Sequence, residues 1–213
     1  MAATTTPRPD TTLRPTARIL LADADDRVLL FRGLNQTDDP AHEWFTPGGG
    51  VHPGESLPVA ASRELREETG ITLPPEAFGA VVAVSSGHWT SGGGRLYFAR
   101  DSYFFVRVPE ATVDVSGMEQ LERELLDTFR WWPLADLRRT ADRLVPPALP
   151  DILEPLLAGT LPATPVTVPW HHPSPRSIRR RASQRRPWRW RVCRARTVVW
   201  PRQSRTPAGE MGA

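Results

Sequence analysis

The stretch that decides the fold runs from Gly49 to Ile71 and reads GGVHPGESLPVAASRELREETGI. It opens with glycines, which allow the backbone to approach a ligand closely. From Ser56 to Thr69 the apolar residues recur at helical spacing, and Ser56 is available as the N-cap. Gly70 stands where the left-handed residue that ends a helix is wanted. The stretch therefore predicts a glycine-rich loop followed by one helix over residues 56–69.

Three acidic residues are placed so that they share one face of this helix. Glu64 is followed by Glu67 and Glu68, at the i+3 and i+4 positions, which puts the three Cβ atoms about 5 to 6 Å apart. Like charges repel there, and a divalent cation would remove the conflict, because Mg²⁺ and Mn²⁺ take clustered carboxylate oxygens as ligands. Arg63 lies one turn before Glu67 and could hold a carboxylate in place. The alternative, a solvated acidic helix face, stays open at this point.

The full stretch resembles the Nudix box. Its fixed positions are Gly49, five residues, Glu55, seven residues, Arg63, Glu64, Leu65, one residue, Glu67, Glu68, one residue, Gly70 and Ile71. Seven identities and two aliphatic positions match within 23 residues, which is specific compared with a lone glycine pattern. The chain is therefore similar to the Nudix hydrolases, and the wider layout supports this from about Thr16 to Leu161.

The resemblance implies an α/β fold, an α/β/α sandwich around a mixed β-sheet, with a loop and a helix that hold Mg²⁺ or Mn²⁺. The metal ligands implied are Glu64, Glu67 and Glu68. The positions implied to be structural are Gly49 and Gly70 in the backbone and the pair of Glu55 with Arg63, which fixes the loop against the helix.

The reaction implied is hydrolysis of a diphosphate linkage in a nucleoside diphosphate joined to another group. Metal-assisted attack of water at phosphorus requires a carboxylate that takes the proton. In the family this base varies, and the local candidates are Glu119, Glu122 and Glu124, of which we favour Glu122. The motifs of substrate-specific members are missing, so a nucleoside triphosphate and a nucleotide sugar are equally admissible.

Around the box, alternating apolar runs and turn residues predict further elements. We expect a hairpin of 17–22 with 27–31, a brief strand over 44–46, and a long antiparallel pair of 80–84 with 96–108. Helical pieces are expected at 119–127, 133–139 and 149–157. The pair Trp131 and Trp132 fits a core role better than base stacking. His88 with Trp89 could line a nucleotide pocket, although such residues are more often ordinary core or surface.

Charge divides the chain into an acidic body and a basic tail. Residues 1–162 hold 15 Arg against 23 Asp and Glu, a net charge of −8, whereas residues 163–213 hold 12 Arg against one Glu. We therefore expect a disordered leader over 1–14, one domain over 15–162, and a disordered Arg-, Pro- and Trp-rich tail over 163–213. The acidic body gives no general reason to expect a nucleic-acid partner, so the expected partner is a small nucleotide-type substrate.

A second hypothesis is a non-catalytic Nudix-fold regulator that senses a nucleotide and contacts nucleic acid through the basic tail. The intact box favours the enzyme. The single cysteine, Cys193, and the lack of a signal-peptide or membrane-spanning pattern favour a cytoplasmic protein that contacts no membrane. The oligomeric state stays open, with a homodimer as one option.

Overall fold

A mixed nine-stranded sheet forms the centre of the part of the chain that the computed structural model describes, which is residue 8 and residues 10–34, 42–90, 94–109, 112–118 and 126–170. Its main path is β8-β3-β2-β1-β6-β5-β9, with β4 paired to β1 and β7 paired to β2. The strands are β1 (Thr12–Ala22), β2 (Arg27–Leu34), β3 (His42–Phe45), β4 (Gly48–Gly50), β5 (Ala83–Thr90), β6 (Leu96–Arg107), β7 (Leu126–Pro133), β8 (Arg143–Val145) and β9 (Val166–Thr167).

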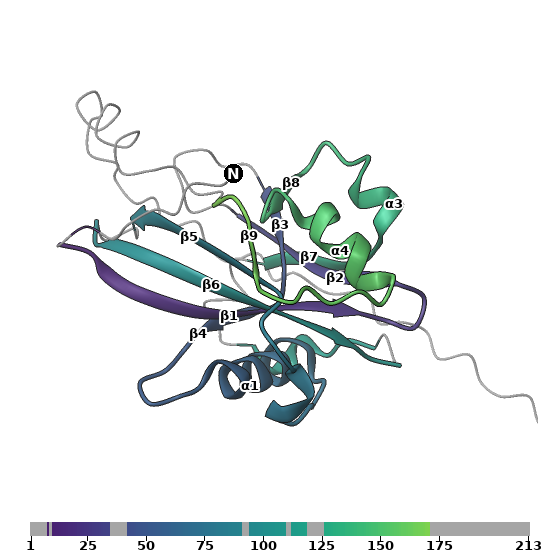
Figure 1. Ribbon diagram of the computed structural model, residues 1–213, viewed down its shortest axis with the longest axis horizontal. Coiled ribbons are helices and arrows are strands. Elements are labelled where there is room, and N and C mark those ends of the chain that lie inside the picture. Colours follow the sequence, from purple (N-terminus) through teal and green to yellow (C-terminus); the bar gives the residue numbers. More distant parts are fainter. Residues whose placement is uncertain are drawn as a thin grey trace, which may run out of the picture.

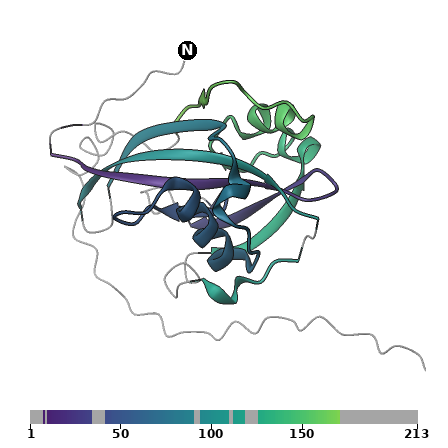
Figure 2. The ribbon, with the colours of Figure 1, turned by 60° about the horizontal axis from the view of Figure 1, so that its bottom comes forward.

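Helices cover both faces of this sheet (Figure 1). The helix α1 (Leu57–Thr69) lies on one face, and α3 (Leu134–Leu137) and α4 (Leu149–Leu157) lie on the other; the turned view in Figure 2 brings α1 forward. Two short 3₁₀ turns, η1 (Pro75–Phe78) and η2 (Val115–Gly117), follow α1 in the sequence and pack against it. The predicted α/β/α sandwich is thus confirmed. Within the described residues, no helix is long and apolar enough to cross a membrane.

The long strands β1 and β6 pair in parallel from Thr12 opposite Tyr97 to Ala22 opposite Arg107. Residues 16–18 of β1 also pair with β4 in the antiparallel sense, which attaches the start of the box to the middle of the sheet. The predicted hairpin with β2 exists, but its register includes only Ala22 opposite Val28. The hairpin therefore pairs at its tip, while the rest of β1 is committed to β6 and β4.

The tight turn between β1 and β2 is built around the buried Asp23. Its Oδ1 accepts the backbone N–H groups of Asp25 at 3.0 Å and Arg27 at 2.8 Å, and its Oδ2 accepts the Arg27 Nε at 2.7 Å. Asp26 adopts a positive φ of 58°, which Asp tolerates better than most residues. The short acidic run thus makes the turn that the sequence predicts, by the side-chain-to-backbone bonds typical of aspartate.

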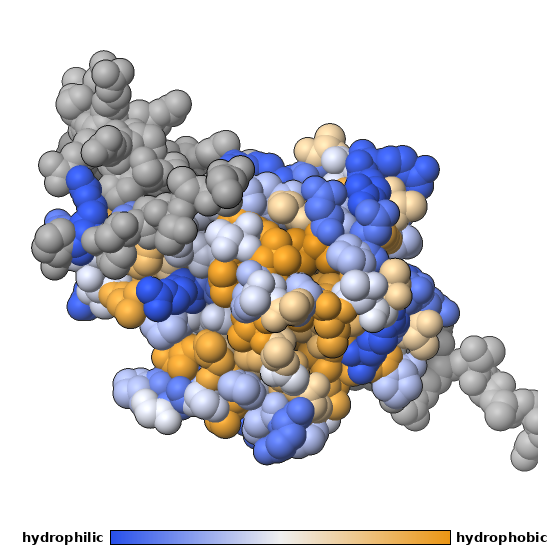
Figure 3. Space-filling view, in the orientation of Figure 1, coloured by the Kyte–Doolittle hydropathy of each residue, from blue (hydrophilic) through white to orange (hydrophobic). Residues whose placement is uncertain are grey.

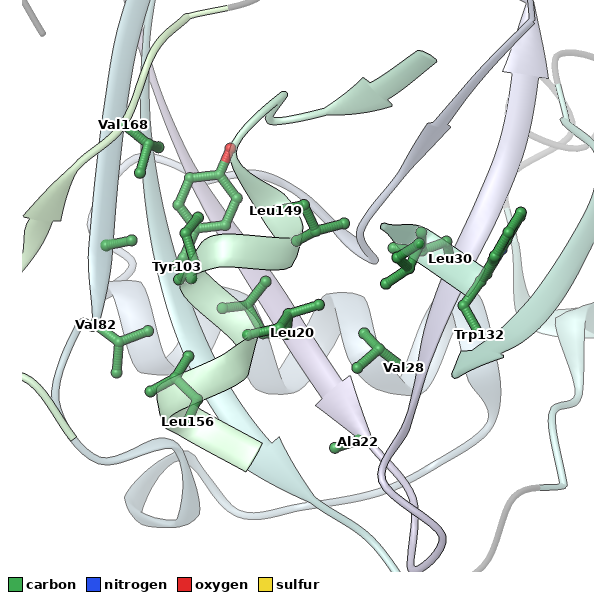
Figure 4. Close-up of a cluster of buried hydrophobic side chains, with 14 of the residues drawn as sticks. Leu20, Ala22, Val28, Leu30, Val82, Tyr103, Trp132, Leu149, Leu156 and Val168 are labelled. Atoms are coloured by element: carbon green, nitrogen blue, oxygen red, sulfur yellow. The ribbon is translucent and has the colours of Figure 1, made fainter. Parts of the chain in front are cut away.

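Two apolar clusters fill the spaces between the layers. One lies on the α4 side, where Leu149 and Leu156 of α4 meet Leu20 of β1 and Tyr103 of β6 (Figure 4). The other lies under α1, whose Ala60, Ala61 and Leu65 are fully buried against the sheet. In the space-filling view, hydrophobic residues gather between the two helical layers (Figure 3). Successive side chains of a strand point to opposite faces of the sheet, so each central strand contributes to both clusters.

The ordered domain extends past both predicted boundaries. Strand β1 begins at Thr12, so residues 12–14, predicted to be leader, belong to the sheet through their parallel pairing with β6. At the other end β9 pairs with β5, and Val168, 5% exposed, donates its N–H to the Val84 carbonyl at 2.9 Å. Residues 166–168 therefore join the sheet, and the part of the predicted tail after residue 170 lies outside the described residues.

The expected helix over 119–127 is wrong at its end, because Leu126 and Asp127 already belong to strand β7. Residues 119–125 lie outside the described part of the chain. The tryptophans behave as predicted. Trp132 is buried edge-on against Trp44, with ring centroids 4.9 Å apart, and Trp131 packs against the core under α1. Helix α4 has the predicted bounds, and α3 is shorter than the expected 133–139.

Candidate active site

The glycine-rich start of the box is strand β4, held edge-to-edge on β1. Arg18 opposes Gly48 in the register and donates a guanidinium hydrogen bond to its carbonyl oxygen. Gly48 has a φ of 118°, and a Cβ there would lie 2.1 Å from the Ala17 carbonyl oxygen. Only glycine fits at that position, because both the backbone conformation and the close approach exclude a side chain.

Gly49 faces the opposite side, toward α1, and makes room for the carboxylate of Glu64. A Cβ on Gly49 would lie 2.6 Å from Glu64 Oε1 and 2.8 Å from Oε2. The Glu64 carboxylate therefore rests directly on the Gly49 backbone, and Glu64 is only 6% exposed. The position of the Glu64 carboxylate therefore depends on the absence of a side chain at Gly49.

Helix α1 presents the three glutamates at different depths. Glu64 and Glu68 are each 6% exposed, whereas the Glu67 side chain is 35% exposed. Glu68 Oε2 accepts the backbone N–H of Gly48 at 2.7 Å, which ties the helix to the start of β4. The helix ends as predicted at Gly70, whose φ is 72° and whose N–H donates to the Arg66 carbonyl. Ser56 occupies the N-cap position but makes no side-chain cap bond.

The Arg63 side chain joins the loop to the helix by hydrogen bonds to both. Its Nε and Nη2 donate to the two oxygens of Glu55, each at 3.0 Å, and Nη2 also donates to the Gly50 carbonyl at 2.8 Å. Its Nη1 donates to Glu64 Oε1 at 2.8 Å and to Glu67 Oε2 at 3.1 Å. A guanidinium has five N–H donors, and these five bonds employ that whole capacity. The predicted clamp of Glu55 on Arg63 is present in the structure.

This network shifts the pKa of both partners of the clamp. The bidentate hydrogen bond from Arg63 lowers the pKa of the Glu55 carboxyl, and the His52 backbone N–H, which donates to Glu55 at 2.9 Å, lowers it further. The bonds to Glu55 first, and then those to Glu64 and Glu67, raise the pKa of Arg63 above its ordinary value. The loop is therefore fixed by a charge pair that stays ionised over the whole neutral range.

The Glu55 clamp gives a pH-dependent contribution to stability. Because its pKa is lowered by folding, the contribution is complete above the unfolded pKa of about 4.3 and disappears as the pH falls through the folded value. We expect Glu55→Gln to lower the free energy of unfolding by about 1 to 3 kcal/mol at pH 7. The difference from wild type should shrink toward zero in denaturant titrations below about pH 4. Glu76→Gln, at an exposed position, is the matched control. If Glu55→Gln lowers the free energy of unfolding by the same amount at every pH, the clamp is contradicted.

The carboxylates suit a hard divalent cation by donor type and by charge. Glu64 and Glu67 place oxygens on either side of one nitrogen, Arg63 Nη1, so a positive group already bridges them. Glu55 shares the same guanidinium, so three carboxylates contact one cationic side chain. Burying carboxylates in such excess calls for further positive charge. Among the described residues, no three acidic, His or Cys side chains converge closely enough to form a complete metal site.

Some features of the site were not predicted from the motif. Turn η2 packs on α1, where a Cβ on Gly117 would lie 2.8 Å from the Glu67 carbonyl oxygen, and Asp114 donates its N–H to the Thr69 carbonyl at 2.8 Å. A short Asp-x-Ser-Gly turn gives little sequence signal for such a contact. The favoured base, Glu122, lies outside the described residues together with Glu119 and Glu124.

The sequence of the described domain matches a known protein family. The NUDIX domain matches residues 12–152 of the chain, which include every element from β1 through β8 and the start of α4. The chain belongs to the Nudix family. The match begins at the residue where β1 begins, in agreement with the structural start of the domain.

Relatives of this Nudix chain include proteins that are named as an RNA pyrophosphohydrolase and as an mRNA hydrolase. It is 34% identical over 151 residues to the RNA pyrophosphohydrolase of Caulobacter vibrioides, covering 62% of this chain and 77% of that protein. It is 38% identical over 120 residues to the m7GpppN-mRNA hydrolase NUDT17 of Bos taurus, covering 53% of this chain and 39% of that protein. The chain is thus a Nudix pyrophosphohydrolase.

A solved structure shares the fold. The MutT protein from Methanosarcina mazei Go1 superposes with a TM-score of 0.52 at 23% identity, covering 69% of this chain and 94% of that protein. The likeness supports the mixed sheet between helical layers. Nudix hydrolases generally use divalent metals.

Proposed function

We propose that this Nudix chain hydrolyses the 5′-terminal diphosphate linkage of RNA, with Mg²⁺ or Mn²⁺ held by Glu64, Glu67 and Glu68. The observation that carries the proposal is the shared guanidinium. Glu64 and Glu67 converge on Arg63 Nη1, and Glu68 is tied to Gly48 at the adjoining end of β4. Glu64 and Glu68 therefore both lie against the glycines of β4, and Glu67 is joined to Glu64 through Arg63.

The chain's own groups have separate roles in this reaction. The Glu55 clamp on Arg63 fixes the loop, and Arg63 orients Glu64 and Glu67 through its Nη1. Gly48 and Gly49 let β1 and the Glu64 carboxylate lie directly against β4. A bound divalent ion supplies positive charge for the phosphate oxygens and makes water more acidic. A carboxylate must accept the proton of the attacking water, and Glu122 is our candidate for that base.

The substrate class comes from the relatives. The protein from Caulobacter vibrioides is named as an RNA pyrophosphohydrolase and the protein from Bos taurus as an m7GpppN-mRNA hydrolase, so both names give RNA as the substrate. A 5′-triphosphorylated RNA contains the nucleoside-diphosphate linkage that the box implies. Nucleoside triphosphates and nucleotide sugars contain it as well and are the alternatives that the assay must separate.

The test is a hydrolysis panel with the purified full chain. We expect a 5′-triphosphorylated RNA oligomer to be converted to the 5′-monophosphate in Mg²⁺ or Mn²⁺, with a higher kcat/KM than ATP or UDP-glucose. Chelation of the metal should abolish turnover, and re-addition should restore it, because the diphosphate charge is otherwise uncompensated. Products are resolved by mass spectrometry. A nucleotide sugar as the best substrate would reject the RNA assignment, and no turnover of any compound with either metal would reject the hydrolase site.

A further inference from the structure

Two aromatic side chains stack at the shared end of β5 and β6. Trp89 of β5 and Tyr97 of β6 are register partners, and their rings lie 4.8 Å apart at an interplanar angle of 17°. Both side chains are half-buried, at the outer ends of strands that extend to one side of the molecule in Figure 1. Their neighbours His88 and Phe98 point to the opposite face and are buried. The stacked pair is therefore a partly open surface, distinct from the core.

Arginines cover the stack on both sides. The Arg14 guanidinium lies 5.5 Å from the centre of the Trp89 ring, and the Arg95 guanidinium lies 5.6 Å from the centre of the Tyr97 ring. Both arginines are exposed. Within the part of the chain that the structure describes, Arg14 forms no ion pair with a carboxylate. The four side chains thus form a cationic, aromatic surface, the Arg14–Trp89–Tyr97–Arg95 platform, on a body whose overall charge is negative.

The platform adjoins the box through Gly50. A Cβ on Gly50 would lie 3.7 Å from Arg14 Nε and 3.8 Å from Arg14 Nη2. The carbonyl of the same glycine accepts the 2.8 Å hydrogen bond from Arg63 Nη2. One residue of β4 therefore separates the arginine of the catalytic box from the arginine of the platform. From this arginine the platform continues across the sheet, to Tyr97 on β6, the strand next to β1, and to Trp89 on β5, one strand further.

We propose that the platform binds the nucleobases of the RNA chain that follows the 5′ phosphates, an inference that rests on the proposed RNA substrate. Single-stranded nucleic acid is bound by aromatic rings that stack on bases and by cations that meet the backbone. Bases also stack on guanidinium planes. A base can therefore replace the exposed Arg14 guanidinium on the Trp89 ring, and Arg14 is then available to a backbone phosphate. The platform extends recognition beyond the nucleotide that carries the diphosphate.

The first measurement uses an RNA that the enzyme cannot cleave. Binding of a labelled 5′-hydroxyl decamer is followed by fluorescence anisotropy, without added metal, for wild type and variants. We expect Trp89→Ala to weaken binding about tenfold and Trp89→Phe to retain most of the affinity, because each stacked base contributes strongly. Arg14→Ala should reduce the dependence of affinity on salt. Arg107→Ala is the matched control, since its guanidinium lies 5.5 Å from the Phe105 ring, outside the platform.

The second measurement separates the platform from the box. For 5′-triphosphorylated RNA, we expect Trp89→Ala to raise KM about tenfold with kcat within about twofold, and to reduce the preference for RNA over ATP by about the same factor. Equal losses on RNA and ATP would overturn the inference in favour of a site for the first base. Unchanged decamer binding by a Trp89→Ala protein with a wild-type melting curve would also overturn it. If no RNA is hydrolysed but Trp89 governs decamer binding, the proposed activity fails and the platform stands.

Discussion

A Glu67→Gln enzyme is expected to turn over at least about a hundredfold more slowly than wild type, with the fall in kcat rather than in KM. Glutamine keeps the size and the hydrogen-bonding oxygen of glutamate but removes the charge that the proposed cation requires. Glu67 is 35% exposed and meets Arg63 Nη1 at 3.1 Å and Arg66 at 3.7 Å, so its loss leaves the helix intact. The measurement is steady-state hydrolysis of 5′-triphosphorylated RNA at saturating Mg²⁺, beside a thermal melt.

Two further variants make this result specific. Glu68→Gln should show a similar loss, because its amide oxygen can still accept the Gly48 N–H that Glu68 Oε2 accepts now. Glu76→Gln removes one exposed carboxylate from the neighbouring η1 turn and should leave kcat unchanged. A Glu67→Gln enzyme as active as the Glu76→Gln enzyme would show that the acidic face of α1 serves solubility alone.

The parts of the site that the sequence predicted are those set by local spacing. Helix α1 begins and ends within one residue of the expected range, because the cap, the apolar period and Gly70 all lie within one short segment. The contact of Glu55 with Arg63 follows from the same segment. The degree to which each glutamate is buried does not follow from this segment. Whether Glu64 or Glu67 is the more buried depends on how α1 packs on β4, and Gly49 decides it by admitting the Glu64 carboxylate.

Long-range pairing explains most of the differences in the fold. Thr12 joins the sheet because it lies opposite Tyr97, a partner 85 residues away that no local pattern reveals. Val166 forms an edge strand through its N–H bond to the Val82 carbonyl, although its own segment is rich in proline and carries no strand period. Register between distant segments is set by the sheet as a whole, so propensity read along the chain cannot supply it.

The net charge of the body does not describe how charge is distributed over its surface. The body over residues 1–162 carries −8, which gave no reason to expect a nucleic-acid partner. Its acidic residues, however, form the turn after β1 and line the box, whereas Arg14 and Arg95 lie over the two stacked rings of Trp89 and Tyr97. Arg14 and Arg95 are 81 positions apart in the sequence and become neighbours of one surface only when β1 pairs with β6. A binding preference inferred from the average charge of a domain is therefore weak where strands bring distant arginines together.

Removing Arg63 should be the most destabilising single change in the box. Arg63→Ala is expected to lower the free energy of unfolding by about 3 to 5 kcal/mol, because it leaves Glu55 and Glu64 largely buried with no cationic partner. Arg63→Lys should recover only part of the loss, since three ammonium donors on a flexible stem cannot reproduce the bidentate bond to Glu55. Denaturant unfolding at pH 7 measures both variants.

The matched control for Arg63→Ala lies one turn along the same helix. Arg66 is 61% exposed, and its contact with Glu67 is a single 3.7 Å ion pair, so Arg66→Ala should cost less than about 1 kcal/mol. The ordering of the two variants should persist in high salt, because an ion pair as buried as that of Arg63 with Glu55 is screened weakly. If the two alanine variants unfold at the same denaturant concentration, Arg63 does not hold the loop to the helix. The carboxylates would then have to be positioned by the backbone of β4 alone.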